Sequence, residues 1–220
     1  MSTSFSAAFS DLSAHERYKL LCAAICPRPI ALVTCVSEAG VVNAAPFSFF
    51  NVFSEEPALI VLGLQHRAPK DGGGVIPKDT TRNIAKSGEF VVNMVDEALA
   101  EAMNITAIDF PPDISEIDAA GLTLRPGVTI PVPHIAEAPI AFECKRTVSM
   151  VFSPHRELVI GEVVRIHARA GLIDPKSLRV DVDAYRPVGR LFANSYSRQS
   201  DRFDLVRETY AEWAAARQTP

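Results

Sequence analysis

The stretch ALVTCVSEAGVVNAAPFSFFNVFS, residues 31–54, decides the fold. It opens with a β-rich run at 31–37, breaks at the turn residues EAG, and continues as a second run at 41–54. Two runs rich in Val and Phe on either side of a glycine-containing turn are typical of an antiparallel hairpin. The stretch therefore predicts a hairpin.

Other runs along the chain also have strand character. Residues 58–64 (ALIVLGL) are continuously apolar, which predicts a strand buried on both faces. Residues 89–95 predict another strand, and 141–152 and 157–173 predict two long strands around a Pro-His-Arg turn. Roughly six or seven strands, with helices only at the edges and between hairpins, indicate an antiparallel barrel and not a doubly wound sheet.

Helices are expected near both ends of the chain. Ser13 and Glu16 have the spacing of a capping box, so residues 15–25 are predicted to form a helix that ends before Pro27. Near the other end, a helix is predicted to open at Ser200 or Asp201. Its apolar residues recur at helical spacing and would share one face: Phe203, Val206, Tyr210 and Trp213.

Shorter helices are expected between strands. Asp79 or Thr80 can cap one that runs to Lys86 and stops at Gly88. A second is predicted to start at Asp96 and to run to about residue 106.

Residues 109–138 contain five prolines and two glycines. They predict a long, ordered excursion from the barrel. Such a length within one domain is typical of a functional segment.

Composition limits the classes of protein. Of the 220 residues, 48% are hydrophobic and 22% charged, which predicts one globular domain over 1–220 with its core at about 15–200. A net charge of −4 without a basic stripe argues against nucleic acid as a partner. The longest apolar stretch, 22–36, is broken by Pro27, Arg28 and Pro29, so no membrane span is expected. The N-terminal residues do not resemble a secretory signal, and a cytoplasmic location is expected.

The sequence points to no protein-borne catalytic group and no metal site. Cys22, Cys26, Cys35 and Cys144 lack metal-ligand spacing and are expected to be reduced, mostly buried thiols. The five histidines are scattered. Neither a catalytic triad nor a carboxylate pair stands out. This pattern suits a cofactor that brings its own chemistry.

Two segments are candidates for binding such a cofactor. Residues 43–51 (NAAPFSFFN) alternate small and aromatic residues at a strand edge, where a planar heterocycle would find backbone hydrogen bonds and apolar surface. An ordinary core hairpin is the alternative. Residues 77–83 (PKDTTRN) bring Lys78, Arg82 and two hydroxyls to a helix start, which favours an anion. Simple capping by Asp79 is the alternative.

Two further segments are also candidates. Gly72–Gly74 could form a phosphate cradle, but the strand and helix of a dinucleotide fingerprint are missing, so a flexible loop is expected. Arg28 lies between two prolines that stiffen its backbone and could aim its side chain at a ligand. The alternative is a charged residue at a domain edge.

In combination, several segments resemble the flavin reductase-like family. They are PRPIALVTCVSEAGVVNAAPFSFFN, KDTTRNI, SGEFVVNMV, LVIGEV and GRLFANSY, which come in the family order and cover roughly residues 15–200. The resemblance implies a mostly β fold: an FMN-binding split β-barrel, antiparallel and of Greek-key type, with peripheral helices. It also implies FMN as the cofactor.

The resemblance further implies a set of site residues. Thr34 and Cys35 would line the ribityl chain and ring, and the segment from Ala45 to Asn51 would hold the ring edge. Lys78, Thr80 and Asn83 would hold the phosphate, and Arg28 and Tyr196 would close the pocket. The complete cofactor-binding set is Arg28, Thr34, Cys35, Ala45, Pro46, Phe47, Ser48, Phe49, Phe50, Asn51, Lys78, Asp79, Thr80, Asn83 and Tyr196.

The sequence departs from the family pattern at two places. Cys35 stands where the family usually shows Ser or Thr, so its hydrogen bond would be weak. Phe192 and Ala193 stand where the family often has two glycines, which would reshape the mouth of the pocket.

For function, the resemblance implies an oxidoreductase, an NAD(P)H-dependent flavin reductase that transfers hydride from a nicotinamide to flavin, with NADH or NADPH as co-substrate. An FMN-carrying electron-transfer protein without its own nicotinamide site is the alternative, and a cofactor-free barrel with a decayed site is a third reading. A homodimer with FMN at its seam is expected, since a split barrel leaves open edges. A monooxygenase or an electron-acceptor protein would be a further partner.

Overall fold

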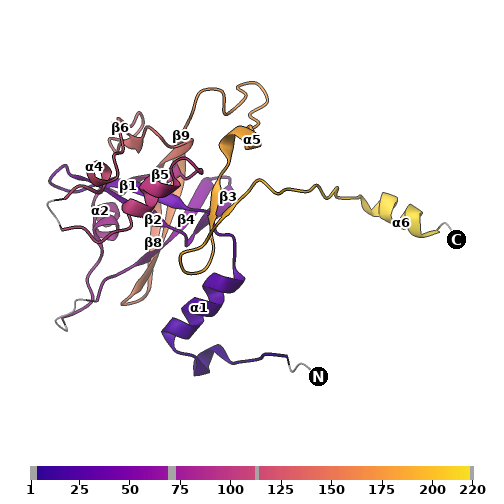
Figure 1. Cartoon of the computed structure of the whole chain (residues 1–220), viewed down its shortest axis with the longest axis horizontal. Coiled ribbons are helices and arrows are strands. Elements are labelled where there is room, and N and C mark those ends of the chain that lie inside the picture. The colour runs from indigo at the N-terminus through magenta and orange to yellow at the C-terminus, as the bar shows by residue number, and fades with distance from the viewer. Residues whose placement is uncertain (1–3, 69–72, 112–113, 219–220) are drawn as a thin grey trace.

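The structure is a computed structural model that describes residues 4–68, 73–111 and 114–218. Its centre is a seven-stranded antiparallel sheet in the order β2-β1-β5-β8-β9-β4-β3 (Figure 1). The strands are β1 (Ala31–Val36), β2 (Val42–Phe47), β3 (Phe50–Glu55), β4 (Ala58–Gln65), β5 (Glu89–Met94), β8 (Ile140–Ser153) and β9 (Arg156–Ala168). The mostly β, antiparallel fold is confirmed.

The second half of the 31–54 stretch is two strands and not one. β2 pairs with β1, whereas β3 pairs with β4 at the other end of the strand order. The chain turns the corner at Ser48 and Phe49, where the carbonyl of Phe49 accepts a 2.7 Å hydrogen bond from the N–H of Gly63. This corner brings the two edges of the sheet together and closes it into a barrel.

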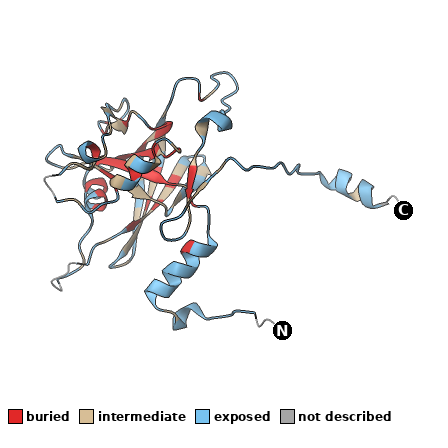
Figure 2. Ribbon diagram, viewed as in Figure 1, coloured by how far each residue is buried: buried red, intermediate tan, exposed pale blue. Residues whose placement is uncertain are grey.

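The interior of the barrel explains the burial pattern of β4. Ile60, Leu62 and Leu64 are buried, while the residues between them are only half-buried. The prediction of a strand buried on both faces is therefore wrong, because one face looks into the barrel and the other outward. Figure 2 shows the buried residues concentrated in the central strands.

One glycine makes room for the largest side chain inside the barrel. A Cβ at Gly161 on β9 would lie 2.5 Å from the ring of Phe90, which is fully buried. Any larger residue at 161 would therefore displace the Phe90 ring.

The first two α-helices start and end at residues with clear local signals. α1 (Ala14–Ala24) opens with the predicted capping box between Ser13 and Glu16. α2 (Asp79–Ser87) ends at Gly88, whose φ of 72° lies in the left-handed region that favours glycine. The predicted caps Asp79 and Thr80 are wrong by a residue or two: Lys78 is the N-cap and makes no side-chain capping bond.

The segment between β5 and β8 contains short elements. They are α3 (Ala100–Ile105), α4 (Glu116–Ala119), β6 (Leu124–Arg125) and β7 (His134–Ile135). Asp96 precedes α3 and accepts a 3.0 Å hydrogen bond from the N–H of Leu99. The helix thus begins a few residues later than predicted.

A buried carboxylate anchors the end of this excursion to the sheet. Glu143 on β8 has no exposed surface and accepts hydrogen bonds of 2.7–2.9 Å from the backbone N–H groups of Val128, Thr129 and Ile130. His167 of β9 lies 2.6 Å away. Burial alone would raise the pKa of Glu143, but these hydrogen bonds outweigh burial and lower the pKa to about 2.

The C-terminal part forms the small elements α5 (Val182–Tyr185), β10 (Val188–Arg190), β11 (Tyr196–Arg198) and α6 (Tyr210–Gln218). The prediction that a helix opens at Ser200 or Asp201 is wrong, because residues 201–209 have no regular secondary structure. α6 starts after Thr209, which exchanges hydrogen bonds with Glu212. At the other end, η1 (Phe9–Asp11) is a single 3-10 turn before α1.

The two termini project from the barrel (Figure 1). Residues 199–218, here called the C-terminal arm, leave the body, and Phe203, Val206 and Tyr210 on it are more than 80% exposed. Within the described residues, no helix is long and apolar enough to cross a membrane.

Candidate functional site

Two clefts meet along strand β2. The first, of about 150 Å³, lies between β2, the start of α2 and residues 106–110. The second, of about 190 Å³, lies between the Ser48 corner, α1 and the β10–β11 hairpin. Both are lined by Pro46, Phe47 and Ala107, so the two clefts adjoin, and together they are here called the trough.

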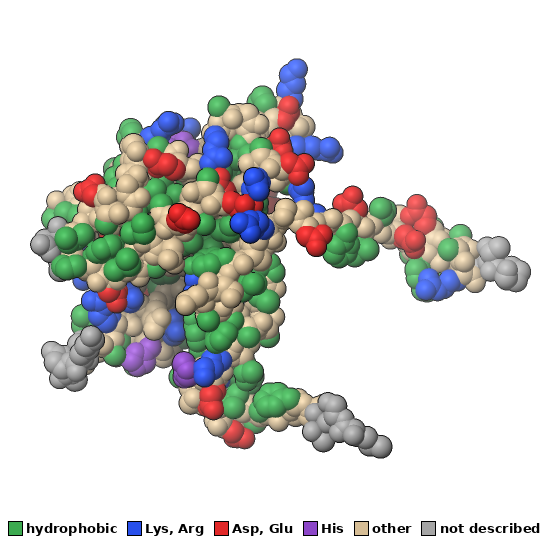
Figure 3. Space-filling view, viewed as in Figure 1, with side chains coloured by type: hydrophobic (Ala, Val, Ile, Leu, Met, Phe, Trp, Pro, Cys, Tyr) green, Lys and Arg blue, Asp and Glu red, His purple; other side chains and the backbone are tan. Residues whose placement is uncertain are grey.

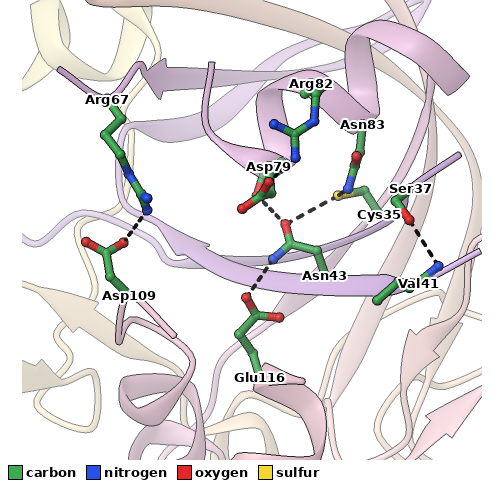
Figure 4. Close-up of polar contacts among 11 residues, drawn as sticks. Cys35, Ser37, Val41, Asn43, Arg67, Asp79, Arg82, Asn83, Asp109 and Glu116 are labelled. Carbon is green, nitrogen blue, oxygen red and sulfur yellow. Dashed lines mark hydrogen bonds and ion pairs between the residues drawn. The ribbon is translucent and has the colours of Figure 1, made fainter. Parts of the chain in front are cut away.

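The first cleft ends in a cluster of charges. Arg67 and Lys78 line it, and both face the carboxylate of Asp109, at 3.0 and 3.7 Å respectively (Figure 4 shows the Arg67 contact). The first turn of α2, with its backbone N–H groups, lies at the same end of the cleft. In the part of the chain that the structure describes, the side chain of the N-cap residue Lys78 makes no hydrogen bond to these N–H groups. This end of the trough therefore favours an anion.

An amide ties the walls of the first cleft together. Asn43 on β2 donates a 3.1 Å hydrogen bond to Glu116 of α4 (Figure 4). It also accepts a 2.8 Å bond from the hydroxyl of Thr80. The Thr80 proton is therefore committed to Asn43. Asp79 forms an ion pair with Arg82 on the same helix turn.

Cys35 lies behind this network, inside the protein. Its thiol donates to Asn43 Oδ1 at 3.7 Å and accepts from Asn83 Nδ2 at 3.6 Å. Burial raises the pKa of Cys35 to about 12, so the group is a neutral thiol at neutral pH. It orients two amides and does not line either cleft.

The second cleft offers aromatic and hydroxyl groups. Tyr18, Ser48 and Tyr196 line it together with Arg190, whose guanidinium lies 4.6 Å from the centre of the Tyr196 ring. Arg190 is hydrogen-bonded to the Tyr196 hydroxyl and to the carbonyl of Ala193. Ala193 has a φ of 53°, a conformation that favours glycine, at one of the two positions where the sequence departs from the family.

Arg28 is placed as a structural anchor. Its guanidinium donates to the carbonyls of Cys22, Ile25 and Leu191 at 2.6–2.9 Å and to the Ser48 hydroxyl at 3.5 Å. It joins the end of α1 to the loop after β10, behind the second cleft, and lines neither part of the trough.

The structure thus brings together part of the residue set expected from sequence. The residues that line the trough are Ala45, Pro46, Phe47, Ser48, Lys78, Asp79, Thr80 and Tyr196. The residues outside its lining are Arg28, Thr34, Cys35, Phe49, Phe50, Asn51 and Asn83. Of these, Thr34 is fully buried and donates a 2.7 Å hydrogen bond to the carbonyl of Pro133.

Sequence reasoning missed several lining residues. Arg67 and Asp109 belong to segments that carry no motif and lie far apart along the chain, and Arg190 was noted only as part of a longer segment. The candidate phosphate cradle at Gly72–Gly74 begins outside the described residues, and neither Gly73 nor Gly74 lines the trough.

Comparison with known proteins decides the family. The model of the flavin reductase like domain matches residues 23–189. The chain belongs to the flavin reductase-like family. A solved structure of 2-nitrobenzoate 2-nitroreductase NbaA from Pseudomonas fluorescens is 43% identical, with a TM-score of 0.84, over 94% of this chain and 98% of that one. Nitrilotriacetate monooxygenase component B from Bacillus cereus is 36% identical, also with a TM-score of 0.84, over 93% of this chain and 100% of that one.

A third solved structure agrees in fold. A protein with a split barrel domain from Shewanella frigidimarina is 20% identical, with a TM-score of 0.75, over 90% of this chain and 96% of that one. The split-barrel fold of this flavin reductase-like protein is thereby confirmed. Family membership supports a flavin cofactor and oxidoreductase chemistry.

Proposed function

We propose that this flavin reductase-like protein binds FMN non-covalently in the trough along β2 and passes to it a hydride from NADH or NADPH. The observation that carries the proposal is the polarity of the trough. One end holds Arg67, Lys78 and the start of α2, and the other end holds Ser48 and Tyr196. FMN is an elongated molecule with a phosphate at one end and a planar ring at the other.

The charged end suits the phosphate. A guanidinium and an ammonium can each form charge-assisted hydrogen bonds to phosphate oxygens, and helix N-termini add free amide donors. Because Thr80 donates to Asn43, we assign the phosphate mainly to Lys78, Arg67 and the backbone of α2. Thr80 and Asn83 then position this end of the trough from behind.

The other end suits the ring. Pro46 and Phe47 provide apolar surface, and the Ser48 corner provides polar groups at a strand edge. Bound FMN would supply the hydride-accepting chemistry. The task of the chain's own residues is to orient the ring and leave one of its faces open to a nicotinamide.

Two relatives suggest where the electrons go. The Bacillus cereus relative is a component of nitrilotriacetate monooxygenase, which favours reduced flavin delivered to a monooxygenase. The Pseudomonas fluorescens relative is a 2-nitrobenzoate 2-nitroreductase, which favours a nitroaromatic compound as a second candidate acceptor.

Anaerobic stopped-flow spectroscopy tests the proposal. The FMN-loaded protein is mixed with NADH or NADPH, and bleaching of the flavin band is followed. Fast bleaching is expected. If dithionite bleaches the flavin but neither nicotinamide does, the chain is an electron-transfer protein and the reductase proposal is wrong. If the protein binds no added FMN, the cofactor assignment itself is wrong.

We also propose that the working unit is a homodimer with FMN near its seam. Large apolar side chains are exposed on β3 (Val52, Phe53), at the end of the β8–β9 hairpin (Val151, Phe152) and on the C-terminal arm (Phe203, Leu205, Val206). Figure 3 shows such hydrophobic groups on the body and along the arm. Exposed apolar side chains that are neighbours on one element, as on β3 and on the β8–β9 hairpin, can form part of a protein–protein contact surface. Dilution should release FMN as the dimer dissociates, and a monomer that keeps FMN in light scattering would contradict the proposal.

A further inference from the structure

Asp109 occupies the charged end of the trough. Among the described residues, Asp109 is the one whose carboxylate lies within ion-pair distance of both cations of the cleft. Its Oδ1 is 3.0 Å from Nη2 of Arg67 and 3.7 Å from Nζ of Lys78. Residues 106–110 around it form one wall of the first cleft. The other two carboxylates of this cleft are engaged elsewhere, since Asp79 pairs with Arg82 and Glu116 accepts from Asn43.

We propose that Asp109 is an internal stand-in for the ligand's phosphate, which holds the two cations in the ligand-free protein and is displaced when FMN binds. The inference rests on the proposed function, because it takes the phosphate to bind at Arg67 and Lys78. It makes Asp109 a residue that sets the affinity for flavin phosphates without contacting the flavin ring.

The energetics favour a readily exchanged contact. The side chains of Asp109, Arg67 and Lys78 are 73%, 48% and 43% exposed, and exposed ion pairs contribute little to stability. A phosphate monoester carries a larger charge than a carboxylate and offers three acceptor oxygens. The phosphate therefore competes successfully for the same donors, but part of its binding free energy is spent on replacing Asp109.

This competition has a functional consequence. A flavin that must displace an anion already in place binds more weakly and leaves more readily than one entering a cleft with unpaired cations. Asp109 thus favours exchange of FMN with solution, which is what a reductase that delivers reduced flavin to another protein requires.

The test compares Asp109→Asn with wild type after bound flavin has been removed. The affinities for FMN and riboflavin are measured by flavin fluorescence. Asp109→Asn should bind FMN at least about threefold more tightly and should release it more slowly, with riboflavin affinity unchanged. Asp118→Asn is the matched control, because it removes an exposed carboxylate of the same segment that does not line the trough.

Inorganic phosphate provides a readout that does not depend on flavin. It should raise the melting temperature of Asp109→Asn more than that of wild type or Asp118→Asn. Weaker FMN binding by Asp109→Asn would overturn the inference, because it would mean that Asp109 orients Arg67 and does not compete with the phosphate. Unchanged FMN binding would overturn it as well, because it would mean that Asp109 does not compete with the phosphate. Failure of the wild type to bind FMN at all would instead count against the proposed function.

Discussion

The hydroxyl of Thr80 donates a 2.8 Å hydrogen bond to Oδ1 of Asn43, which joins the first turn of α2 to strand β2. The amide nitrogen of Asn43 continues the connection to Glu116 of α4, 3.1 Å away. One side chain therefore fixes the relative positions of three elements that enclose the first cleft.

Asn43→Asp should destabilise the protein by about 2 kcal/mol, because it removes a donor and places two carboxylates in contact. Adding Glu116→Gln should recover much of that loss, since the glutamine amide can donate to the new carboxylate. Urea unfolding of the two single variants and the double variant measures the coupling. If the two changes are simply additive, the bond between these side chains does not hold the cleft together.

Glu143 should make the protein sensitive to acid. Its pKa is lowered to about 2 in the folded state, so its contribution to stability is fully present above its ordinary pKa of about 4.5. The contribution is lost as the pH falls from there toward about 2. The shift corresponds to roughly 3 kcal/mol at neutral pH.

The variant Glu143→Gln tests this contribution. It should be less stable than wild type at pH 7, and its stability should fall less between pH 5 and pH 3. Glu101→Gln, an exposed residue on α3, is the control and should behave as wild type does. An equal loss of stability in acid for wild type and Glu143→Gln would contradict the assignment.

Ala45→Trp should abolish FMN binding, because Ala45 lines the first cleft and an indole would fill about 150 Å³ of space. Ala39→Trp, in the exposed turn between β1 and β2, is the matched control and should leave binding intact. Circular dichroism checks that both variants are folded. Normal FMN affinity in a folded Ala45→Trp variant would place the flavin elsewhere.

Thiol labelling should distinguish Cys26 from the other cysteines. Cys26 is exposed, while Cys22, Cys35 and Cys144 are buried. Burial also raises the pKa of Cys35 to about 12 and raises that of Cys144. The native protein should react at one thiol and the denatured protein at all four. Rapid labelling of Cys35 in the native state would mean that it is open to the trough.

Local signals predicted the elements better than the site. Ser13 with Glu16 and Gly88 marked helix ends correctly because capping depends on neighbouring residues. By contrast, the helical spacing that includes Phe203 and Val206 did not produce a helix over residues 201–209, and α6 begins only at Tyr210. An amphipathic pattern needs an apolar surface to pack against, whereas Phe203 and Val206 are 81% and 89% exposed and Arg202 is tied to the body by an ion pair with Asp183.

The remaining differences come from tertiary structure. The run 41–54 divides into β2 and β3 at a corner that contains no glycine. The corner is held by the hydrogen bond from the N–H of Gly63 on β4 to the carbonyl of Phe49. Arg67 and Asp109 are hydrogen-bonded although they lie 42 residues apart in the sequence, and no sequence-spacing rule predicts such a contact. Thr34, Cys35 and Asn83 were expected at the flavin from family resemblance, yet their side chains bond to groups inside the protein.

Binding of FMN and riboflavin to wild type and Lys78→Glu tests the central claim most directly. Of the two ligands, only FMN carries the phosphate proposed to bind beside Lys78. The substitution should therefore weaken FMN binding by at least about tenfold more than it weakens riboflavin binding. Lys86→Glu, an exposed change at the other end of the same helix, should affect neither ligand. Equal losses for FMN and riboflavin in Lys78→Glu would contradict the phosphate assignment and with it the orientation of the flavin in the trough.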